Sequence, residues 1–280
     1  MKILVTGSSG QLGSVTVHHL KSFDHDVFGI DLIKHPPTDQ LVDIQDSQQL
    51  EEILQGVDAI VHTAALHGKH TDLNYTRGAF IDVNIKGTLN LLNAAIKNNV
   101  KKFLYMSTTS IYGTAMKDEK QAVWVDEALV EKPRDIYDIT KQCCEQLCKD
   151  FFDKEGLEAT VYRVARFLPE TENSRINHRL YRGLDERDGA EAIRLALLHH
   201  FKEFDVFNIS SGSPFKKEDL SLLKHEPLTA ILKYYPEAQE IYRKKGWTFP
   251  ETIDRVYVSE KAKTIFGYIP KYTFDFLLHN

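Results

Sequence analysis

The chain has few cysteines, no excess of positive charge and no long apolar run, and each shortage excludes a class of protein. Three cysteines in 280 residues are too few for a disulfide scaffold. A formal net charge of −5 provides no basic surface, so nucleic acid is not an expected partner. No apolar stretch approaches the roughly 18 residues that a membrane span requires. Because Met1 leads directly into a predicted strand, we expect no signal peptide, a cytoplasmic location and no membrane partner.

The three cysteines crowd onto one predicted helix. Cys144 and Cys148 are four residues apart, but no histidine or further cysteine nearby completes a metal-binding set. We therefore expect reduced thiols packed in a helix, and no metal site.

The first thirteen residues have the pattern of a dinucleotide-binding turn. An apolar run over residues 2–6 predicts a buried parallel strand, and a G-x-x-G-x-x-G turn at 7–13 opens into a helical pattern over 11–22. The glycines permit a tight turn, the approach of a diphosphate, and close packing of the helix, whose free N–H groups face the anion. A plain structural turn is the alternative. The residues assigned to the cofactor here are Gly7, Ser9, Gly10, Gln11, Leu12 and Gly13.

Strand and helix patterns alternate through the first part of the chain. Strands are predicted over residues 26–31, 41–44, 57–62, 103–106 and 159–163, and helices over 47–55, 80–98 and 136–155. After about residue 167 the rhythm weakens, with helices expected over 187–201, 217–224 and 236–245 around a strand at 206–209. The pattern predicts an α/β fold with a Rossmann-type, doubly wound parallel sheet. We expect an NAD-binding domain over 1–166 and a small, mostly helical C-terminal lobe over 167–280, interleaved with the first.

An acidic residue ends the second predicted strand. Asp31 stands where a carboxylate hydrogen-bonds the adenosine ribose, and it would repel a 2′-phosphate. NAD is therefore favoured over NADP, although Lys34 is close enough to weaken that preference. A solvated aspartate at a strand end is the alternative. Asp43 and Ile44 could flank the adenine ring, or form a plain loop.

A tyrosine and a lysine four residues apart are candidates for proton transfer. Tyr137 and Lys141 project from one face of a predicted helix. The ammonium would lower the pKa of the phenol, so that it could take a proton from a substrate hydroxyl. A hydroxyl from the run at 107–110, which follows the fifth predicted strand, could bind the reacting oxygen. A surface helix pair and a Ser/Thr turn are the simpler readings of these two features.

Taken together, these motifs resemble the extended short-chain dehydrogenase/reductase family, the NAD-dependent epimerase/dehydratases. The matching segments are T-G-S-S-G-Q-L-G at 6–13, Asp31, H-T-A-A at 62–65, N-I-K-G-T at 84–88, S-T-T-S-I-Y-G at 107–113, D-E at 126–127 with Pro133, Tyr137 with Lys141, F-N-I-S-S-G at 207–212, V-S-E-K-A at 258–262 and F-G-Y-I-P at 266–270. The resemblance covers nearly the whole chain. Each motif is modest, and the ordered combination is what makes the match specific.

The resemblance implies a role for each position. Thr108 would be the catalytic hydroxyl, Tyr137 the acid/base, and Lys141 the group that shifts the pKa of the phenol and holds the nicotinamide ribose. Further residues are implied around the cofactor: Thr63, Ala64 and Ala65 along the phosphate–ribose groove, Asn84 organising a helix and a water, Ser107 nearer the cofactor, and Val164 beside the nicotinamide amide.

One segment departs from the family pattern. Nucleotide-sugar members carry R-x-x-N-x-x-G-P after the sixth strand, but here Arg166 replaces the asparagine and the glycine is missing. The stretch R-F-L-P-E at 166–170, followed by Arg175, looks more like the uronate dehydrogenase branch, in which an arginine clamps a sugar carboxylate. A guanidinium suits a carboxylate or a phosphate, so the choice stays open. His67 and Thr109 complete the expected substrate contacts, with a solvated loop histidine as the alternative for His67.

Three functions follow from this reading. The first is NAD-dependent epimerisation or dehydration of a nucleotide sugar or related sugar, by hydride transfer at a hydroxyl or carbonyl. The second is oxidation of a free sugar acid by a dehydrogenase. The third, of a different class, is a non-catalytic NAD(P)-binding regulatory protein. Family habit also suggests a homodimer through the helices at 80–98 and 136–155.

Overall fold

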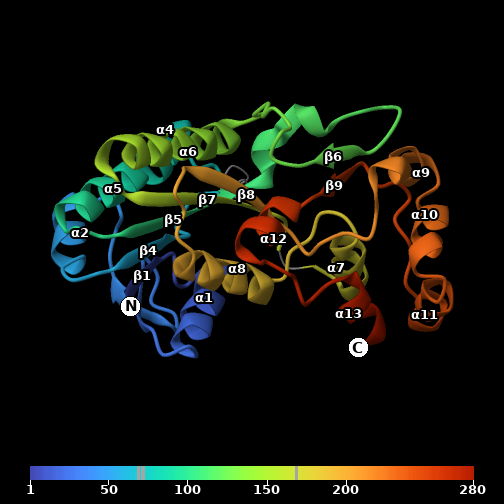
Figure 1. The fold of residues 1–280 in the computed structure, drawn as a ribbon, viewed down its shortest axis with the longest axis horizontal. Coiled ribbons are helices and arrows are strands. Elements are labelled where there is room, and N and C mark those ends of the chain that lie inside the picture. Colours follow the sequence, from blue (N-terminus) through green and yellow to red (C-terminus); the bar gives the residue numbers. More distant parts are fainter. Residues whose placement is uncertain (68–69, 71–72, 168–169) are drawn as a thin grey trace.

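The computed structural model describes residues 1–280 except 68, 69, 71, 72, 168 and 169. Seven strands form one parallel sheet in the order β3-β2-β1-β4-β5-β7-β8 (Figure 1). Their bounds are β1 (Lys2–Thr6), β2 (Asp26–Asp31), β3 (Thr38–Leu41), β4 (Ala59–His62), β5 (Lys102–Thr108), β7 (Glu158–Val164) and β8 (Asp205–Ile209). The Rossmann-type fold class predicted from the sequence is confirmed.

Helices cover both faces of the sheet because its central strands, such as β1, β4 and β5, are buried on both sides. In β1, Ile3 and Val5 pack with α1 (Gln11–Lys21) and α8 (Glu186–Leu198), whereas Leu4 faces the opposite layer. That layer consists of α2 (Ser47–Ile53), α5 (Gly87–Lys97) and α6 (Ile136–Glu155) (Figure 1). The strand order reverses between β1 and β4, so the carboxyl ends of these strands flank the crevice where such folds bind ligands.

The predicted helix over 80–98 is interrupted. The structure has a short helix α4 (Arg77–Phe80), a π-helical turn η1 (Ile81–Lys86) and then α5. The N–H of Gly87 donates to the carbonyl of Asp82, five residues back. Such π-turns free backbone groups and often occur at functional sites. Sequence periodicity does not reveal this one, because its apolar stripe continues through the turn.

A lobe with its own core lies beyond the ends of the strands. Its parallel pair is β6 (Val123–Val125) with β9 (Arg255–Tyr257), and Ile231, Tyr242 and Phe274 are buried together in it. Its helical elements include α7 (Glu172–Arg179), η3 (Lys217–Asp219), α9 (Leu220–His225), α10 (Pro227–Tyr234), α11 (Ala238–Lys245) and α13 (Phe274–His279), while η2 (Thr109–Met116) follows β5 and α12 (Glu260–Phe266) packs beside β8. In Figure 1 the lobe lies on the side of the sheet marked by β6 and β9.

One predicted strand is wrong. Residues 41–44 were expected to form the third strand, but β3 spans Thr38–Leu41 and pairs with β2 from Gly29 onward. Because β3 is the edge strand, Asp39 and Gln40 can be exposed, and the sequence pattern missed it. Val42 and Ile44 are buried for another reason, since they pack under the helices beside the sheet.

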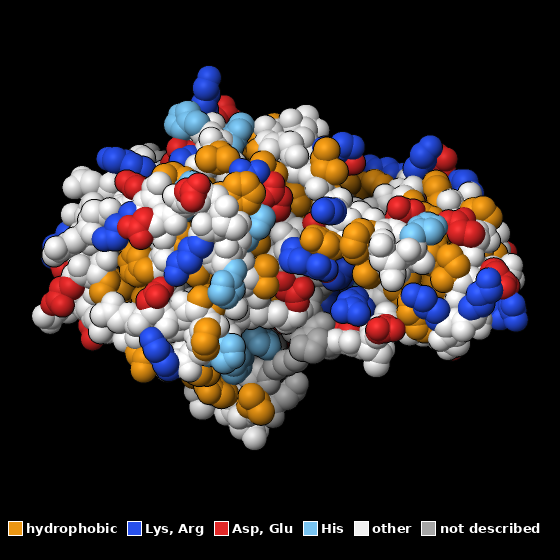
Figure 2. Space-filling view, turned by 90° about the horizontal axis from the view of Figure 1, so that it is seen from below, with side chains coloured by type: hydrophobic (Ala, Val, Ile, Leu, Met, Phe, Trp, Pro, Cys, Tyr) orange, Lys and Arg blue, Asp and Glu red, His pale blue; other side chains and the backbone are white. Residues whose placement is uncertain are grey.

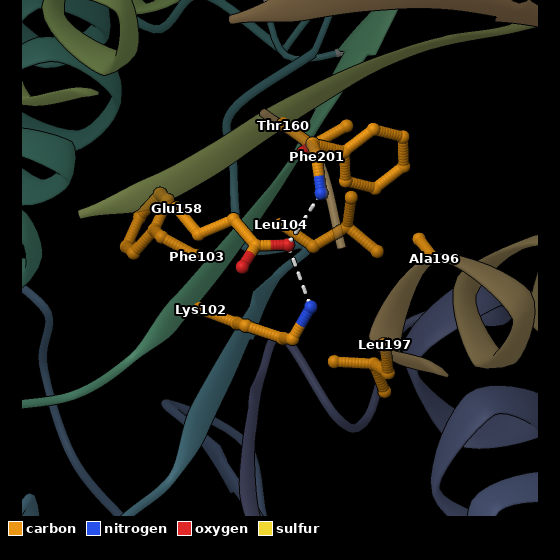
Figure 3. A pocket seen from close by; sticks show the side chains of 8 residues that line it. All are labelled: Lys102, Phe103, Leu104, Glu158, Thr160, Ala196, Leu197 and Phe201. Atoms are coloured by element: carbon orange, nitrogen blue, oxygen red, sulfur yellow. Dashed lines mark hydrogen bonds and ion pairs between the residues drawn. The ribbon is translucent and has the colours of Figure 1, made fainter. Parts of the chain in front are cut away.

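The amino end of the sheet is closed at β5 and β7. A cavity of about 10 Å³ lies there, between the first residues of β5 and β7 and the end of α8 (Figure 3). Lys102 Nζ contacts Glu158 Oε1 at 2.6 Å, and the same oxygen accepts the N–H of Phe201 at 2.9 Å. This space holds at most a single water, so it offers no ligand site.

Side chains of both charges share the surface, as expected from a chain with similar numbers of basic and acidic residues. Figure 2 shows basic and acidic side chains interspersed on one face of the molecule. Among the residues that the structure describes, no helix is both long and apolar enough to cross a membrane. The three cysteines lie on α6, with Cys144 and Cys148 buried.

Candidate active site

The glycine-rich turn is fixed by close backbone contacts. Gly7 has φ +70°, and a Cβ there would lie 2.7 Å from the backbone nitrogen of Ala64. A Cβ on Gly13 would lie 2.2 Å from the Gly7 carbonyl oxygen, whereas one on Gly10 would meet only that oxygen, at 3.1 Å. Gly7 and Gly13 are therefore required by sterics, and Gly10 leaves the mouth of the turn open. The N-terminus of α1 has no side-chain cap and no acidic residue in its first turn, so its N–H groups suit a diphosphate.

Asp31 lies against this turn. Its carboxylate accepts the N–H of Ser9 at 3.0 Å and the N–H of Ile33 at 3.1 Å. Lys34 points elsewhere, because its Nζ donates to the carbonyls of Thr38 and Asp39 at 2.8 and 2.9 Å. The Lys34 ammonium, which weakened the sequence argument for NAD over NADP, is thus hydrogen-bonded to the backbone of β3.

The loop after β4 is held on the turn. Thr63 Oγ1 donates to the Thr6 carbonyl at 2.7 Å, and the N–H of Ala64 donates to Thr6 Oγ1 at 3.2 Å. These bonds place Thr63 and Ala64 directly beside Gly7, and Ala65 follows half-buried. The groove expected along 63–65 therefore starts at the glycine-rich turn.

The two residues expected to flank adenine differ in their burial and in their contacts. Asp43 is half-buried, and its carboxylate accepts the N–H of Gln45 at 2.9 Å. The side chain of Ile44 is buried against Gly87 of α5, where a Cβ on the glycine would lie 2.6 Å from Ile44 Cδ1. The Ile44 side chain is thus part of the core, which leaves only its backbone for a ligand.

The structure brings Tyr137, Thr108 and Lys141 together at the end of β5. Tyr137 is in the first turn of α6, after the N-cap Asp135, and its hydroxyl faces the Thr108 side chain, whose hydrogen-bonding interaction lowers the pKa of the phenol. Lys141, one turn later, donates from Nζ to the Met106 carbonyl at 2.7 Å. The spacing of four on one helix face, together with the strand end, accounts for this convergence.

Burial dominates the proton affinities of the pair. It raises the pKa of the Tyr137 phenol above its ordinary value; the Thr108 hydrogen bond lowers it, and Asp138 and Asp135 raise it further. Burial lowers the pKa of Lys141 to about 8, although Cys144, Glu145 and Cys148 act in the opposite direction. The expected lowering of the tyrosine pKa is therefore wrong for the chain alone, because desolvation dominates and Lys141 is not among the groups that shift this pKa.

Two of the four hydroxyls at 107–110, around the end of β5, do not face the crevice. Ser107 is buried and donates to Glu145 Oε1, not toward a cofactor as expected. Thr109, expected to contact the substrate, is also buried, and its Oγ1 donates to the Val164 carbonyl at 3.4 Å. Alternation along the strand explains the result, since Thr108 points opposite to Ser107. Val164 ends β7 in register with Thr108.

The sequence patterns did not predict a buried ion network that lies behind this cluster. Arg163 of β7 donates from Nε and Nη2 to the Glu145 carboxylate at 3.1 and 2.7 Å, and from Nη1 to the Tyr112 hydroxyl at 3.0 Å. Tyr112 donates in turn to Asn208 Oδ1 at 2.9 Å. The available signal was a charged residue inside an apolar strand, because a buried guanidinium needs a carboxylate partner.

Arg166 is engaged with an internal carboxylate. Its Nε donates to Glu170 Oε1 at 2.7 Å, and His178 Nδ1 contacts the same oxygen at 2.7 Å. Arg182 Nη2 lies 2.6 Å from His178 Nε2. Because a guanidinium only donates, His178 Nε2 accepts and Nδ1–H donates to Glu170, so the ring is neutral. Two arginines and one carboxylate leave this group of four with one net positive charge.

The remaining expected contact residues lie on α7, in the loop after β4 and in η1. Arg175 is exposed on α7. His67, in the loop after β4, is half-buried with its ring centroid 4.6 Å from that of His70. Leu168 and Pro169, part of the stretch likened to uronate dehydrogenases, lie outside the described residues. Asn84, within η1, hydrogen-bonds the backbone N–H and carbonyl of Leu66.

The chain is similar to known proteins in both sequence and fold. Residues 3–187 match the sequence model of the NAD dependent epimerase/dehydratase family. Uronate dehydrogenases of Pseudomonas syringae pv. tomato and Pseudomonas putida are 24% and 26% identical over 181 and 184 residues, which is 62% of this chain in both cases. The matched segments span 62% and 64% of those two proteins, less than two thirds of their length. The structure of UDP-N-acetylglucosamine 4-epimerase from Bacillus cereus superposes with a TM-score of 0.72 at 26% identity, covering 99% of this chain and 96% of that one.

Proposed function

Since the chain belongs to the NAD-dependent epimerase/dehydratase family, we propose that it is an NAD-dependent enzyme that transfers hydride at a hydroxyl- or carbonyl-bearing carbon of a sugar. The observation that carries this proposal is the meeting of the Tyr137 and Thr108 side chains at the end of β5, with the Lys141 ammonium one helical turn away. The N-terminus of α1, which follows the glycine-rich turn and has no side-chain cap, supports the assignment of NAD as cofactor. A purely regulatory NAD-binding protein would need none of the three side chains.

Each of the three residues has a defined task in this proposal. Thr108 donates a hydrogen bond to the reacting oxygen and keeps it beside the phenol. Tyr137 takes the proton from a substrate hydroxyl in oxidation and returns it to the carbonyl oxygen in reduction. Lys141, largely protonated below its pKa of about 8, stabilises the phenolate while the proton is away. NAD, when bound, supplies the hydride acceptor.

NAD is proposed as the cofactor in preference to NADP. Asp31 holds a negative charge at the place where a 2′-phosphate would lie, and its contact with the Ser9 N–H fixes it there. Lys34 cannot compensate while its ammonium is bonded to the Thr38 and Asp39 carbonyls. The backbone N–H groups at the start of α1 would hold the diphosphate.

The cation group around Arg166 favours oxidation of a sugar acid as a second candidate. Arg166 follows β7 by two residues, and Val164 of that strand is in register with Thr108. Two residues of extended chain span roughly 7 Å, about the length of a sugar ring. A carboxylate on the substrate would compete with Glu170 for Arg166. Nucleotide sugars, the first candidate, would present a diphosphate to the same charge.

A substrate panel tests the proposal. Purified protein is mixed with NAD and, separately, with uronates, neutral aldoses and nucleotide sugars. Accumulating NADH with a uronate supports the dehydrogenase; an epimeric or dehydrated product detected by NMR without net NADH supports epimerase or dehydratase chemistry. If NAD fails to bind in calorimetry, or no sugar changes at high protein concentration, the proposal is wrong.

We further propose that the chain forms a homodimer through η1, α5 and α6. Ile81 and Ile139 are large apolar side chains on these elements and are 40% and 50% exposed. Pairing the same helices from two copies would cover both. Light scattering after size exclusion should give twice the chain mass of 32.1 kDa. A monomer at micromolar concentration would contradict this.

A further inference from the structure

A line of buried hydrogen bonds runs from the end of β1, just before the glycine-rich turn, to η1. Thr6, the last residue of β1, lies 2.7 Å from His62 Nδ1 at the end of β4. His62 Nε2 lies 3.0 Å from Thr88 Oγ1 in α5, and Thr88 Oγ1 lies 2.5 Å from the Asn84 carbonyl oxygen. The side chains of Thr6, His62 and Thr88 are all buried. The line therefore joins a strand, its neighbour and a helix without reaching solvent.

The chemistry of the partners fixes every proton in this line. A carbonyl only accepts, so the single hydroxyl proton of Thr88 goes to Asn84, and Thr88 Oγ1 must accept from His62 Nε2–H. Burial and the charge of Lys141 lower the pKa of His62 to about 3, so the ring is neutral and Nδ1 accepts from Thr6. Thr6 Oγ1 in turn accepts the Ala64 N–H at 3.2 Å. All donors point the same way, from Ala64 toward Asn84.

Asn84 carries the connection onward to the proposed catalytic helix. Its Oδ1 accepts the Leu66 N–H at 2.8 Å, and its Nδ2 donates to the Leu66 carbonyl and to Thr140 Oγ1, each at 2.9 Å. Thr140 directly precedes Lys141 on α6. The Asn84 carbonyl also accepts from Cys144 Sγ at 3.1 Å. One amide thus clamps the loop after β4, the π-turn and α6 together.

Packing alone does not call for an imidazole at position 62. The ring lies 6.0 and 5.6 Å from the rings of Phe103 and Tyr105, where an apolar side chain would also pack. A buried polar ring costs free energy unless both nitrogens are bonded. What the imidazole adds is a donor and an acceptor about a ring's width apart, aimed at two different elements.

We propose that His62 is a positioning residue, which couples the glycine-rich turn through Thr88 to Asn84 and so sets the placement of Tyr137 and Lys141. The structural part of this proposal is independent of catalysis. Its kinetic consequence rests on the proposed function.

Two amide substitutions separate the two ends of the ring. Asn places its amide near the position of Nδ1 and reaches only Thr6, whereas Gln reaches the position of Nε2 and can still donate to Thr88. His62→Asn should lower kcat about 10-fold and leave the dissociation constant for NAD within about twofold. His62→Gln should retain most of kcat. Equal kcat in the two variants, or equal losses of kcat and NAD affinity in His62→Asn, would overturn the proposal.

Thr88 provides a matched pair at the next link. Thr88→Val removes the hydroxyl but keeps the shape, and it should reproduce the loss of kcat seen in His62→Asn. Thr88→Ser keeps the hydroxyl and should retain most of kcat. Similar kinetics for Val and Ser would show that the hydroxyl carries no coupling.

Two measurements decide the question without any turnover. Nitrogen-15 NMR of the histidine rings should show His62 as the neutral Nε2–H tautomer from pH 5 to 8, and an Nδ1–H tautomer would refute the assignment. Hydrogen exchange of the Leu66 amide should be about 10-fold faster in His62→Asn and Thr88→Val, but not in His62→Gln. Unchanged exchange would overturn the coupling. If no sugar is ever turned over, the proposed function fails while these two results still stand.

Discussion

Replacing Glu145 with glutamine should destabilise the protein strongly, because it leaves the buried Arg163 guanidinium with only the partly exposed Glu131 carboxylate as a charge partner. Glu145 is 2% exposed and accepts four hydrogen bonds from Arg163 and Ser107. An amide can accept at only one of its two polar atoms, and its NH2 group would face the arginine donors. Glu131, a second acceptor for Arg163, is partly exposed and bonds only Nη2.

The expected cost follows from the burial of the pair. Removing one partner of a buried ion pair costs about 3–5 kcal/mol. For a chain of this size that is a fall in Tm of roughly 10 °C. A second effect follows at Lys141, since Glu145 raises the pKa of that lysine and its neutralisation should lower the value of about 8 further.

Urea unfolding followed by circular dichroism measures the loss, and a surface carboxylate provides the control. Glu191 accepts from Arg194 and contacts His19, but its side chain is 32% exposed, so Glu191→Gln should cost less than about 1 kcal/mol. The double variant Glu145→Leu/Arg163→Met should recover a large part of the loss, because it removes both charges. Equal destabilisation by Glu145→Gln and Glu191→Gln would refute the reasoning.

Three further predictions concern charge around the crevice. Asp31→Ala should weaken NAD binding roughly 10-fold and relax the rejection of NADP, and unchanged affinities in calorimetry would remove Asp31 from the site. Lys141 has a pKa of about 8 in the folded chain against 10.5 ordinarily, so its protonated form opposes folding; the free energy of unfolding should rise by about 3 kcal/mol between pH 8 and 10.5, a rise that Lys141→Met lacks. Parallel pH curves for the two proteins would contradict this. Glu170→Gln should lower KM for a uronate severalfold relative to a neutral sugar, since Arg166 loses its internal partner; equal changes for both sugars would show that Arg166 does not bind the acid.

Local sequence patterns were enough to predict most of the strands and helices of the fold and the meeting of three side chains. The helix predicted over 136–155 has those bounds in the structure, and β2 spans the predicted 26–31. A spacing of four placed Tyr137 and Lys141 on one helix face, and the end of β5 placed Thr108 beside them. These features depend on short-range periodicity, which a sequence carries directly.

Features that depend on contacts between distant segments were not accessible. Ser107 turns to Glu145, 38 residues later, and the sequence does not show which hydroxyl of the run faces the crevice. The engagement of Arg166 by Glu170 needs the loop conformation after β7. The edge strand β3 was misplaced because its exposed residues carry no apolar pattern. The roles of the cofactor- and substrate-site residues stay predictions.

The central claim is that Tyr137 transfers the proton, so the most direct measurement is the turnover of Tyr137→Phe at saturating NAD with a substrate found in the panel. The account predicts that kcat falls by about 100-fold or more while the dissociation constant for NAD changes less than twofold, because phenylalanine keeps the ring and loses only the hydroxyl that meets Thr108. Turnover at the wild-type rate by Tyr137→Phe would contradict it.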